Sequence, residues 1–275
     1  MPPGHDAIPG APANANRSVQ SINLLVFLSM KTAPYGRIVF GASAVLFGVI
    51  ALKWHDADTW QNTSYIWKLP LGLAIGVFLM ALQIAGGIGI QFPRAARVAS
   101  ILLGLVYSIF ALSCIRGIIA APKVFAQYGS FFEQFCLLSG AVAVFAAAEA
   151  NAAKAAAFGR LARLGLGLCA ISFTVGQIVY LSFTAALVPK WIPPKQMFWA
   201  VLTTIAFALA AIAILVNRRA GLAMRLMTLM LGLFGLLVWV PRLVAHPEAH
   251  GNWSEFALTV LITGAAWVVA DLKSF

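Results

Sequence analysis

The sequence predicts an all-α polytopic membrane protein with eight transmembrane helices, arranged as two parallel tandem four-helix bundles. Of its 275 residues 61% are hydrophobic and 10% are charged, whereas soluble proteins average about 45 to 50% apolar and roughly 25% charged residues. The apolar residues also gather in windows of about 20, the length at which a helix crosses roughly 30 Å of hydrocarbon. Such windows fall near 35–52, 69–90, 97–119, 132–149, 161–183, 197–216, 222–244 and 254–271.

Charged residues occur in the same order along the first four windows and along the last four. Each half opens on an aromatic residue, a glycine and an arginine, has an arginine near the end of its third window, and has an acid near each end of its fourth. The matched residues are Arg37 and Arg160, Arg116 and Arg242, Glu133 and Glu255, and Glu149 and Asp271. We therefore expect a tail with an interfacial segment at 1–34, and two four-helix units at 35–150 and 151–275. Each unit has an even number of spans, so the repeat is parallel.

The lysines and arginines are divided unequally between the two sides of the predicted membrane. If both termini and the second, fourth and sixth loops share a side, that side carries twelve of the 19 basic residues. Cytoplasmic loops are enriched in lysine and arginine, so both termini are predicted to be cytoplasmic. This bias also explains the net charge of +11 without a nucleic-acid partner.

Glycine and proline mark several of the elements in order along the chain. Residues 1–21 are rich in Pro, Ala, Gly and Asn and predict a disordered tail, and 22–30 predict an interfacial helix. In the second span, Gly86–Gly89 favours close packing against neighbouring helices. Pro193–Pro194 suits the first turn of the sixth helix, and Pro241 should kink or end the seventh.

The ionic residues at the outer ends of the spans are candidates for a ligand site. A short turn joins the third and fourth spans of each unit, which favours the ion pairs Arg116–Glu133 and Arg242–Glu255. These groups would share the outer part of the bundle with two glutamines predicted deeper in the spans, Gln83 and Gln177.

At the inner ends, the expected pairs depend on the packing within each unit. In an up-down-up-down bundle the fourth helix ends beside the first. This arrangement favours structural ion pairs between Arg37 and Glu149 and between Arg160 and Asp271.

Two interpretations of these polar groups are open. In the first, the ion pairs hold the helix ends together and fix their register, so that removing one partner of a pair leaves the other charge in a poorly solvated place. In the second, the outer pairs and a glutamine line a polar pocket that receives a lipid headgroup, a quinone ring or another amphiphile. Loss of function without loss of membrane abundance in Arg116→Ala or Arg242→Ala would favour the pocket.

The cysteines and histidines indicate no catalytic or cofactor chemistry. Cys114 and Cys136 have similar predicted depth, so a disulfide and simple apolar packing are both open, and Cys169 stands alone. The histidines fall in the tail and the loops, so no span offers a facing pair for haem, and no metal set is recognised. No catalytic residues and no cofactor are therefore predicted.

Two stretches resemble the DoxX-like family of bacterial integral membrane proteins. They are Gly36–Gly41 through Lys53 in the first half and Leu187–Trp199, which leads into an Ala-rich span, in the second. The usual unit of that family is a four-helix bundle, so the resemblance covers two copies after residue 34. It implies a bacterial inner membrane and, in some members, an association with quinone-linked or thiol redox complexes, but it implies no shared catalytic residues.

These observations together favour a non-catalytic membrane component. We expect an accessory protein that binds a partner or a small amphiphile within the lipid bilayer, with a quinone and a redox-complex protein as the partners that the resemblance suggests. The alternative is a small-molecule transporter or a membrane enzyme that uses the outer Arg/Glu pockets. A cavity of about 300 Å³ or more at those residues would favour ligand binding, and a sealed centre would favour the accessory role.

Overall fold

The structure of the protein is a computed structural model, which describes residues 35–54, 66 and 68–272. The predicted tail, the interfacial segment and the loop at His55 lie outside these residues. Throughout the described part every regular element is helical, and eight helical segments are long and apolar enough to cross a membrane. The predicted all-α membrane class is confirmed.

Seven of these segments are single α-helices and one is composite. The single helices are α2 (Tyr35–Trp54), α4 (Gly72–Gly89), α5 (Ala96–Ala120), α6 (Phe125–Ala148), α7 (Ala152–Val179), α9 (Gln196–Leu215) and α12 (His250–Ala270). The composite segment consists of α10 (Ala220–Phe234), the π-helical turn η1 (Gly235–Trp239) and α11 (Val240–Ala245), and a short helix α8 (Leu181–Leu187) follows α7. We call the end with connections 121–124, 188–195 and 246–249 the distal end, and the end with connections 90–95, 149–151 and 216–219 the proximal end.

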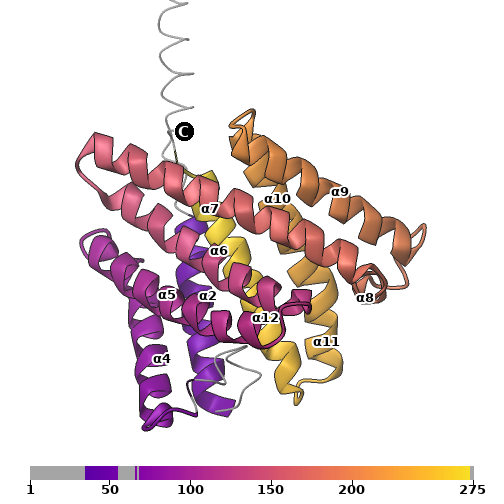
Figure 1. Ribbon diagram of the computed structural model, residues 1–275, viewed down its shortest axis with the longest axis horizontal. Helices are drawn as coiled ribbons and strands as arrows, with labels where there is room; N and C mark the ends of the chain where they lie inside the picture. Colours follow the sequence, from indigo (N-terminus) through magenta and orange to yellow (C-terminus); the bar gives the residue numbers. More distant parts are fainter. Residues whose placement is uncertain (1–34, 55–65, 67, 273–275) are drawn as a thin grey trace, which may run out of the picture. The chain divides into compact units, whose positions relative to one another are not determined.

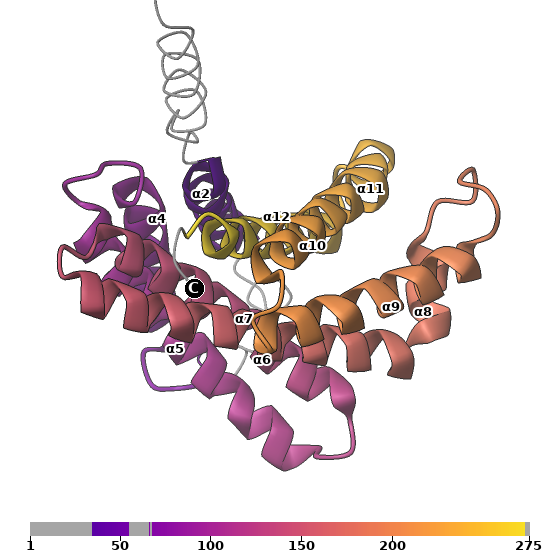
Figure 2. The same ribbon diagram turned by 90° about the horizontal axis from the view of Figure 1, so that it is seen from above.

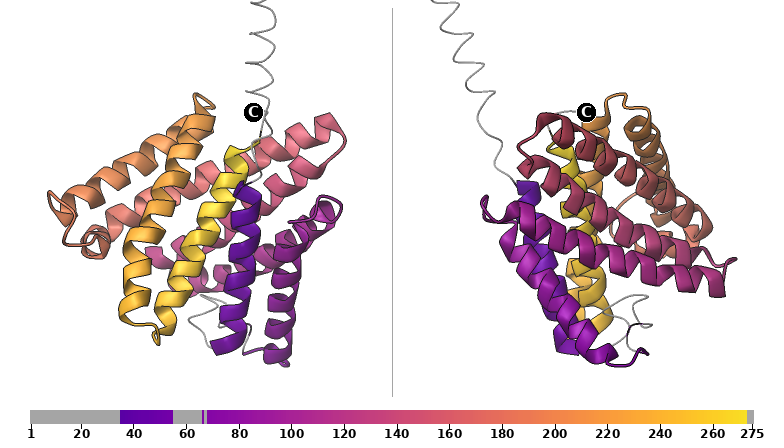
Figure 3. Two further views of the ribbon diagram at one scale, coloured as in Figure 1. Left: turned by 180° about the vertical axis from the view of Figure 1, so that it is seen from behind. Right: turned by 60° about the vertical axis from the view of Figure 1, so that its left-hand side comes forward.

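The long helices of residues 34–275 pack in two layers. One layer runs in the order α5, α6, α7, α9, which lie toward the viewer in Figure 1. The other runs in the order α4, α2, α12, α10, whose helices lie side by side in the left view of Figure 3. The layers meet where α4 packs on α5, α12 on α6 and α7, and α10 on α9. Figure 2 shows α8 and α9 diverging from α10 and α11 at one edge.

The packing at the centre depends on α12, which is the most buried of the eight segments. Small residues let its neighbours approach closely, as expected where lipid gives helices no hydrophobic drive to associate. A Cβ on Gly264 would lie 2.6 Å from the backbone N and Cα of Phe40 on α2. Likewise, a Cβ on Gly140 of α6 would lie 2.6 Å from the Cβ of Ala265. The three helices therefore touch almost backbone to backbone.

The order of neighbours differs from that of an up-down-up-down bundle within each predicted unit. The fourth helix of the first unit, α6, packs chiefly on α5, α7 and α12, whereas α2 packs on α4 and α12. The position beside α2 is thus taken by the last helix of the chain. Residues 34–275 accordingly form one compact body in which the helices of the two predicted units interlock.

The glycines of the second span pack as predicted, and of the two outcomes expected at Pro241, a kink or a helix end, the second does not occur because the helix continues to Ala245. Cβ atoms on Gly86 and Gly87 would meet Leu103 of α5 and the carbonyl oxygen of Gly41 on α2 at 2.7 Å each. Pro241 lies in the first turn of α11, directly after η1. A proline lacks the N–H that an α-helix needs, and the wider turn of η1 accommodates that loss while the helix continues.

Candidate functional site

A cavity of about 1200 Å³ lies between the two layers at the edge formed by α9 and α10. Its walls come from α6, α7, α8, α9, the α10–η1 segment and α12, and none of its lining residues belongs to α2, α4 or α5. It is large enough for a lipid-sized or drug-sized molecule, since such sites usually span about 300 to 1,000 Å³.

Two helices present a matching Gly/Glu stripe to this cavity. On α6, Gly129 and Glu133 are four residues apart, and on α12 Gly251 and Glu255 have the same spacing. Residues four apart lie on one face of a helix, so each glutamate sits one turn below a glycine. A Cβ on either glycine would meet nothing within 4 Å. The glycines therefore open space in front of the carboxylates.

The two glutamates are electrostatic neighbours. The negative charge of Glu255 acts on Glu133, and Arg242 acts on Glu255 with the opposite sign. Arg242 does not line the cavity, and its guanidinium lies 5.1 Å from the centroid of the Trp239 ring. Next to Glu255, the hydroxyl of Ser254 lies 3.0 Å from Nε2 of His250.

The opposite wall, from α7 and α9, carries neutral polar groups. The side-chain oxygen of Gln177 accepts hydrogen bonds from the hydroxyls of Thr203 at 3.2 Å and Thr204 at 2.9 Å. Below it, Ser172 is 5% exposed, lines the cavity, and its hydroxyl has no hydrogen-bond partner in the described part of the chain. Buried hydroxyls are normally satisfied, so this one is available to a bound molecule.

Polar and apolar lining residues are separated along the helix axes. At about 1.5 Å of rise per residue, the polar lining side chains on α6, α7, α9 and α12 all lie within roughly 14 Å of the distal helix ends. Farther from that end the lining includes Leu226, Leu229 and Met230 of α10 and Ile262 of α12. The polar lining is therefore confined to the distal part of the cavity, where apolar residues such as Phe125 and Phe183 also line it, and the part beyond is apolar.

The structure gathers three of the six predicted ligand-site residues in this cavity. Glu133, Glu255 and Gln177 line it, whereas Arg116 and Arg242 do not, and the charge of Arg242 acts on Glu255. Gln83 lies elsewhere, fully buried between α4 and α2, where its amide nitrogen donates to the carbonyl oxygen of Ala44 at 3.0 Å.

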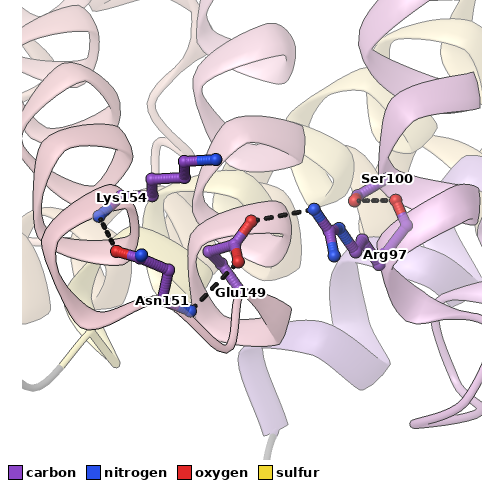
Figure 4. Close-up of polar contacts among 5 residues, drawn as sticks. All are labelled: Arg97, Ser100, Glu149, Asn151 and Lys154. Atoms are coloured by element: carbon purple, nitrogen blue, oxygen red, sulfur yellow. Dashed lines mark hydrogen bonds and ion pairs between the residues drawn. The ribbon is translucent and has the colours of Figure 1, made fainter.

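At the proximal end, the carboxylate of Glu149 has a different partner from the predicted one. It lies 3.0 Å from the guanidinium of Arg97 on α5 and accepts the backbone N–H of Asn151 (Figure 4). Asn151 in turn caps α7 by accepting the N–H of Lys154 at 3.0 Å. The Asn151 N–H, and after it Arg97 and Lys154, hold the pKa of Glu149 below its ordinary value. Arg37 is displaced from this role because α6 packs against α5 rather than against α2.

Asp271 also lies beside a group other than the predicted Arg160. It follows α12, accepts a hydrogen bond from the backbone N–H of Gly36 at the start of α2, and feels the charge of Arg225 on α10. Partial desolvation nevertheless raises the pKa of this carboxyl. The prediction differed because α12 ends beside α2 and not beside α7.

The cysteines are thiols, and their neighbours differ from the predicted ones. Cys114, Cys136 and Cys169 are all buried and unbridged. Cys136 lies next to Cys169 on α7, whose thiol also donates to the carbonyl oxygen of Phe132 at 3.3 Å. Within residues 35–54, 66 and 68–272, no group of three or more His, Cys, Asp or Glu residues is placed to hold a metal ion.

Sequence reasoning missed the small and hydroxyl-bearing residues of the cavity. Ser172 and Thr203 sit in apolar windows that also fit a tightly packed helix, and Gly129 precedes the window at 132–149. The available signal was the repeated Gly-x-x-x-Glu spacing at 129–133 and 251–255, which places a gap and a carboxylate on one helix face in both halves.

No family model matches this sequence, and no curated protein or solved structure matches it either.

Proposed function

We propose that this protein binds a membrane amphiphile, a molecule with a polar head and an apolar chain, in the cavity between its two helix layers. The observation that carries the proposal is the cavity of about 1200 Å³ with polar residues at its distal end and leucine, methionine and isoleucine beyond them. An amphiphile is the class of molecule whose own polarity changes in the same way along its length.

The packing of the remaining helices supports a site kept open for a ligand. Helices in a bilayer associate through close van der Waals contact, and α2, α6 and α12 make such contact through Gly140 and Gly264. Between α9 and α10 the same chain instead presents Gly129, Thr203 and Ser172 to an open space. The free energy lost by leaving that space unpacked is recovered when a ligand occupies it.

The test is a pair of matched glycine substitutions. Gly129→Phe places a ring in the cavity, and Gly221→Phe on α10 is the control, because a Cβ at either position meets nothing within 4 Å and Gly221 does not line the cavity. Each variant is purified in lipid nanodiscs, and the bound small molecules are identified by native mass spectrometry.

We expect wild type and Gly221→Phe to retain the same amphiphile, and Gly129→Phe to lose it while still eluting as a folded, monodisperse protein. Equal retention by all three proteins would place the molecule outside the cavity. The absence of any retained or added amphiphile from wild type would refute the function.

The proposal extends to the internal repeat of the chain and to its orientation in the membrane. We infer two copies of one four-helix unit, because exchanging α2 with α7, α4 with α9, α5 with α10 and α6 with α12 reproduces the main neighbours of each helix. The DoxX-like resemblance suggests a bacterial inner membrane, and the distribution of basic residues favours both termini in the cytoplasm. Reporter fusions at each terminus and in the 188–195 connection test this, and a periplasmic terminus would reverse the orientation.

The DoxX-like resemblance adds a class of partner to the proposal. It suggests that the protein works beside a quinone-linked or thiol redox complex. The bound amphiphile or a protein partner would connect it to that complex. Affinity purification from native membranes tests it, since a redox complex should then be recovered with wild type at a fixed ratio. Recovery of the protein without any redox component would remove this partner and leave the amphiphile site intact.

A further inference from the structure

The charged residues of the cavity indicate which kind of polar head the bound amphiphile has. This inference rests on the proposed function. The chain carries a net charge of +11, yet the described residues that line the cavity include two acids, Glu133 and Glu255, and no lysine, arginine or histidine. Arg242 and His250 are neighbours of this end but stand outside the lining. This acidic part of the cavity faces the place where a polar head would lie.

We propose that the amphiphile carries a cationic, ammonium-type head that Glu133 and Glu255 bind from two sides. The two carboxylates come from adjacent helices, α6 and α12, and each has an open glycine one turn toward the distal end. They are close enough for their charges to interact, and like charges in a poorly solvated place repel each other. A cation between them removes that repulsion and forms two charge-assisted contacts.

An independent observation on the facing wall points to the same place. The buried hydroxyl of Ser172 lines the cavity and is unsatisfied among the described residues. At about 1.5 Å per residue it lies roughly 10 Å from the distal end of α7, and Glu133 lies roughly 12 Å from the start of α6. A hydroxyl oxygen at that depth accepts a hydrogen bond from an ammonium N–H.

The apolar part of the cavity takes the alkyl chain. Leu226 and Leu233 both line it and are seven residues apart on α10, which corresponds to about 10 Å along a helix. Leu226, Leu229 and Leu233 are more than 40% exposed, so this wall faces both the cavity and the surrounding lipid. A chain can therefore enter sideways from the bilayer.

Calorimetric titration in phosphatidylcholine nanodiscs tests the head group at constant chain length. The probes are decylammonium, decanoate and decylubiquinone, each corrected with empty nanodiscs. The proteins are wild type, Glu133→Gln, Glu255→Gln, the double Gln variant and Gly129→Phe. Size-exclusion elution and melting temperature show which variants are folded. If the double Gln variant does not fold, each single Gln variant still tests the proposal.

We expect decylammonium to bind wild type at least about tenfold tighter than the other two probes, because a charge pair that is partly shielded from solvent is worth more than an exposed one. Each Gln substitution should reduce that preference, and Gly129→Phe should weaken all three probes. Tighter binding of decanoate or decylubiquinone, or an ammonium preference unchanged by Glu→Gln, would overturn the cationic head while leaving the amphiphile site in place. Failure of all three probes to bind wild type would instead remove the proposed function itself.

The ammonium head can belong to a membrane lipid or to a single-chain amine, and a second arm separates these sources. Nanodiscs that contain phosphatidylethanolamine are compared with pure phosphatidylcholine nanodiscs in the same decylammonium titration. Weaker apparent binding of the probe in the first set, together with phosphatidylethanolamine retained by wild type and lost from the double Gln variant, identifies the lipid. Equal probe binding in both sets identifies the single-chain amine.

Discussion

At the edge formed by α4 and α5, which belong to the first half of the chain, large buried side chains fill the space between the helices. At the edge formed by α9 and α10, which belong to the second half, the corresponding space is the cavity. Met80, Leu103 and Tyr107 are fully buried at the first edge. At the second, short side chains such as Ser172 and Thr203 face an open space. The main neighbours of the helices correspond in the two halves, so side-chain volume decides which edge is packed and which is hollow.

The helices at the two edges also differ in the fraction of their residues that is buried. In the most apolar window of α5, 44% of the residues are buried, against 28% for the composite segment of α10, η1 and α11. Elements with few buried contacts open at lower free-energy cost than the rest of a fold. The α10 wall is therefore the part of this bundle best suited to admit a ligand, and substitutions at the two edges should have different consequences.

The largest expected effect is at the centre, where both halves meet. Gly264→Leu should prevent folding or lower the free energy of unfolding by about 3 kcal/mol or more, since the new side chain meets the backbone of Phe40 and α2 must move away. Gly221→Leu, which meets open space, is the matched control. Melting temperature and the yield of monodisperse protein measure the difference, and a stable Gly264→Leu variant would contradict the close packing.

At the hollow edge, Ser172→Ala should leave folding unchanged but weaken amphiphile binding. The hydroxyl of Ser172 has no partner to lose in the described structure, so its removal costs the empty protein little. If the ligand uses this hydroxyl, binding should weaken by about fivefold to tenfold, the usual worth of one hydrogen bond. Titration of the retained amphiphile measures this, and unchanged affinity would exclude Ser172 from the site.

The proximal end offers a test of the junction between the two halves. Asn151→Ala should lower the free energy of unfolding by about 1 kcal/mol, because it removes the side-chain cap of α7. Asn151→Asp is the control that keeps a capping oxygen. Chemical or thermal unfolding in detergent measures both, and equal losses would argue against the cap.

At the packed edge, Tyr107→Phe should keep or slightly raise stability, by up to about 1 kcal/mol. Its hydroxyl is fully buried without a hydrogen-bond partner among the described residues, so the phenylalanine keeps the packing and removes an unsatisfied group. Amphiphile binding should not change, because Tyr107 does not line the cavity. A loss of stability would reveal a partner for the hydroxyl.

The smallest expected effect concerns pH. The folded state holds the pKa of Glu149 below its ordinary value of 4.5, so this carboxylate stabilises the fold above that value and the contribution is lost as the pH falls through the lowered pKa. Glu149→Gln should therefore melt slightly below wild type near pH 7, and the two should converge once the pH falls below the lowered pKa of Glu149. A difference that grows on acidification would contradict the assigned sign.

The sequence was sufficient for the elements and for part of the site. Apolar windows placed all eight long helices, although α6 and α7 begin well before theirs, at Phe125 and Ala152, because aromatic and alanine-rich segments extend them. It also singled out Glu133, Glu255 and Gln177. It misplaced Gln83 and the partners of Glu149 and Asp271, because a linear pattern gives the depth of a residue in the membrane but not the face or the neighbour of its helix.

What the sequence determined by itself is therefore the number of the long helices and their apolar, membrane-spanning class, since these depend on local hydrophobicity along one chain. Only the tertiary structure decided that α12 packs beside α2, that Glu149 binds Arg97, and that two distant glutamates share one cavity. These features depend on which helices come into contact, and in lipid that choice is made by the fit of small side chains such as Gly264 and Gly140 rather than by hydrophobicity.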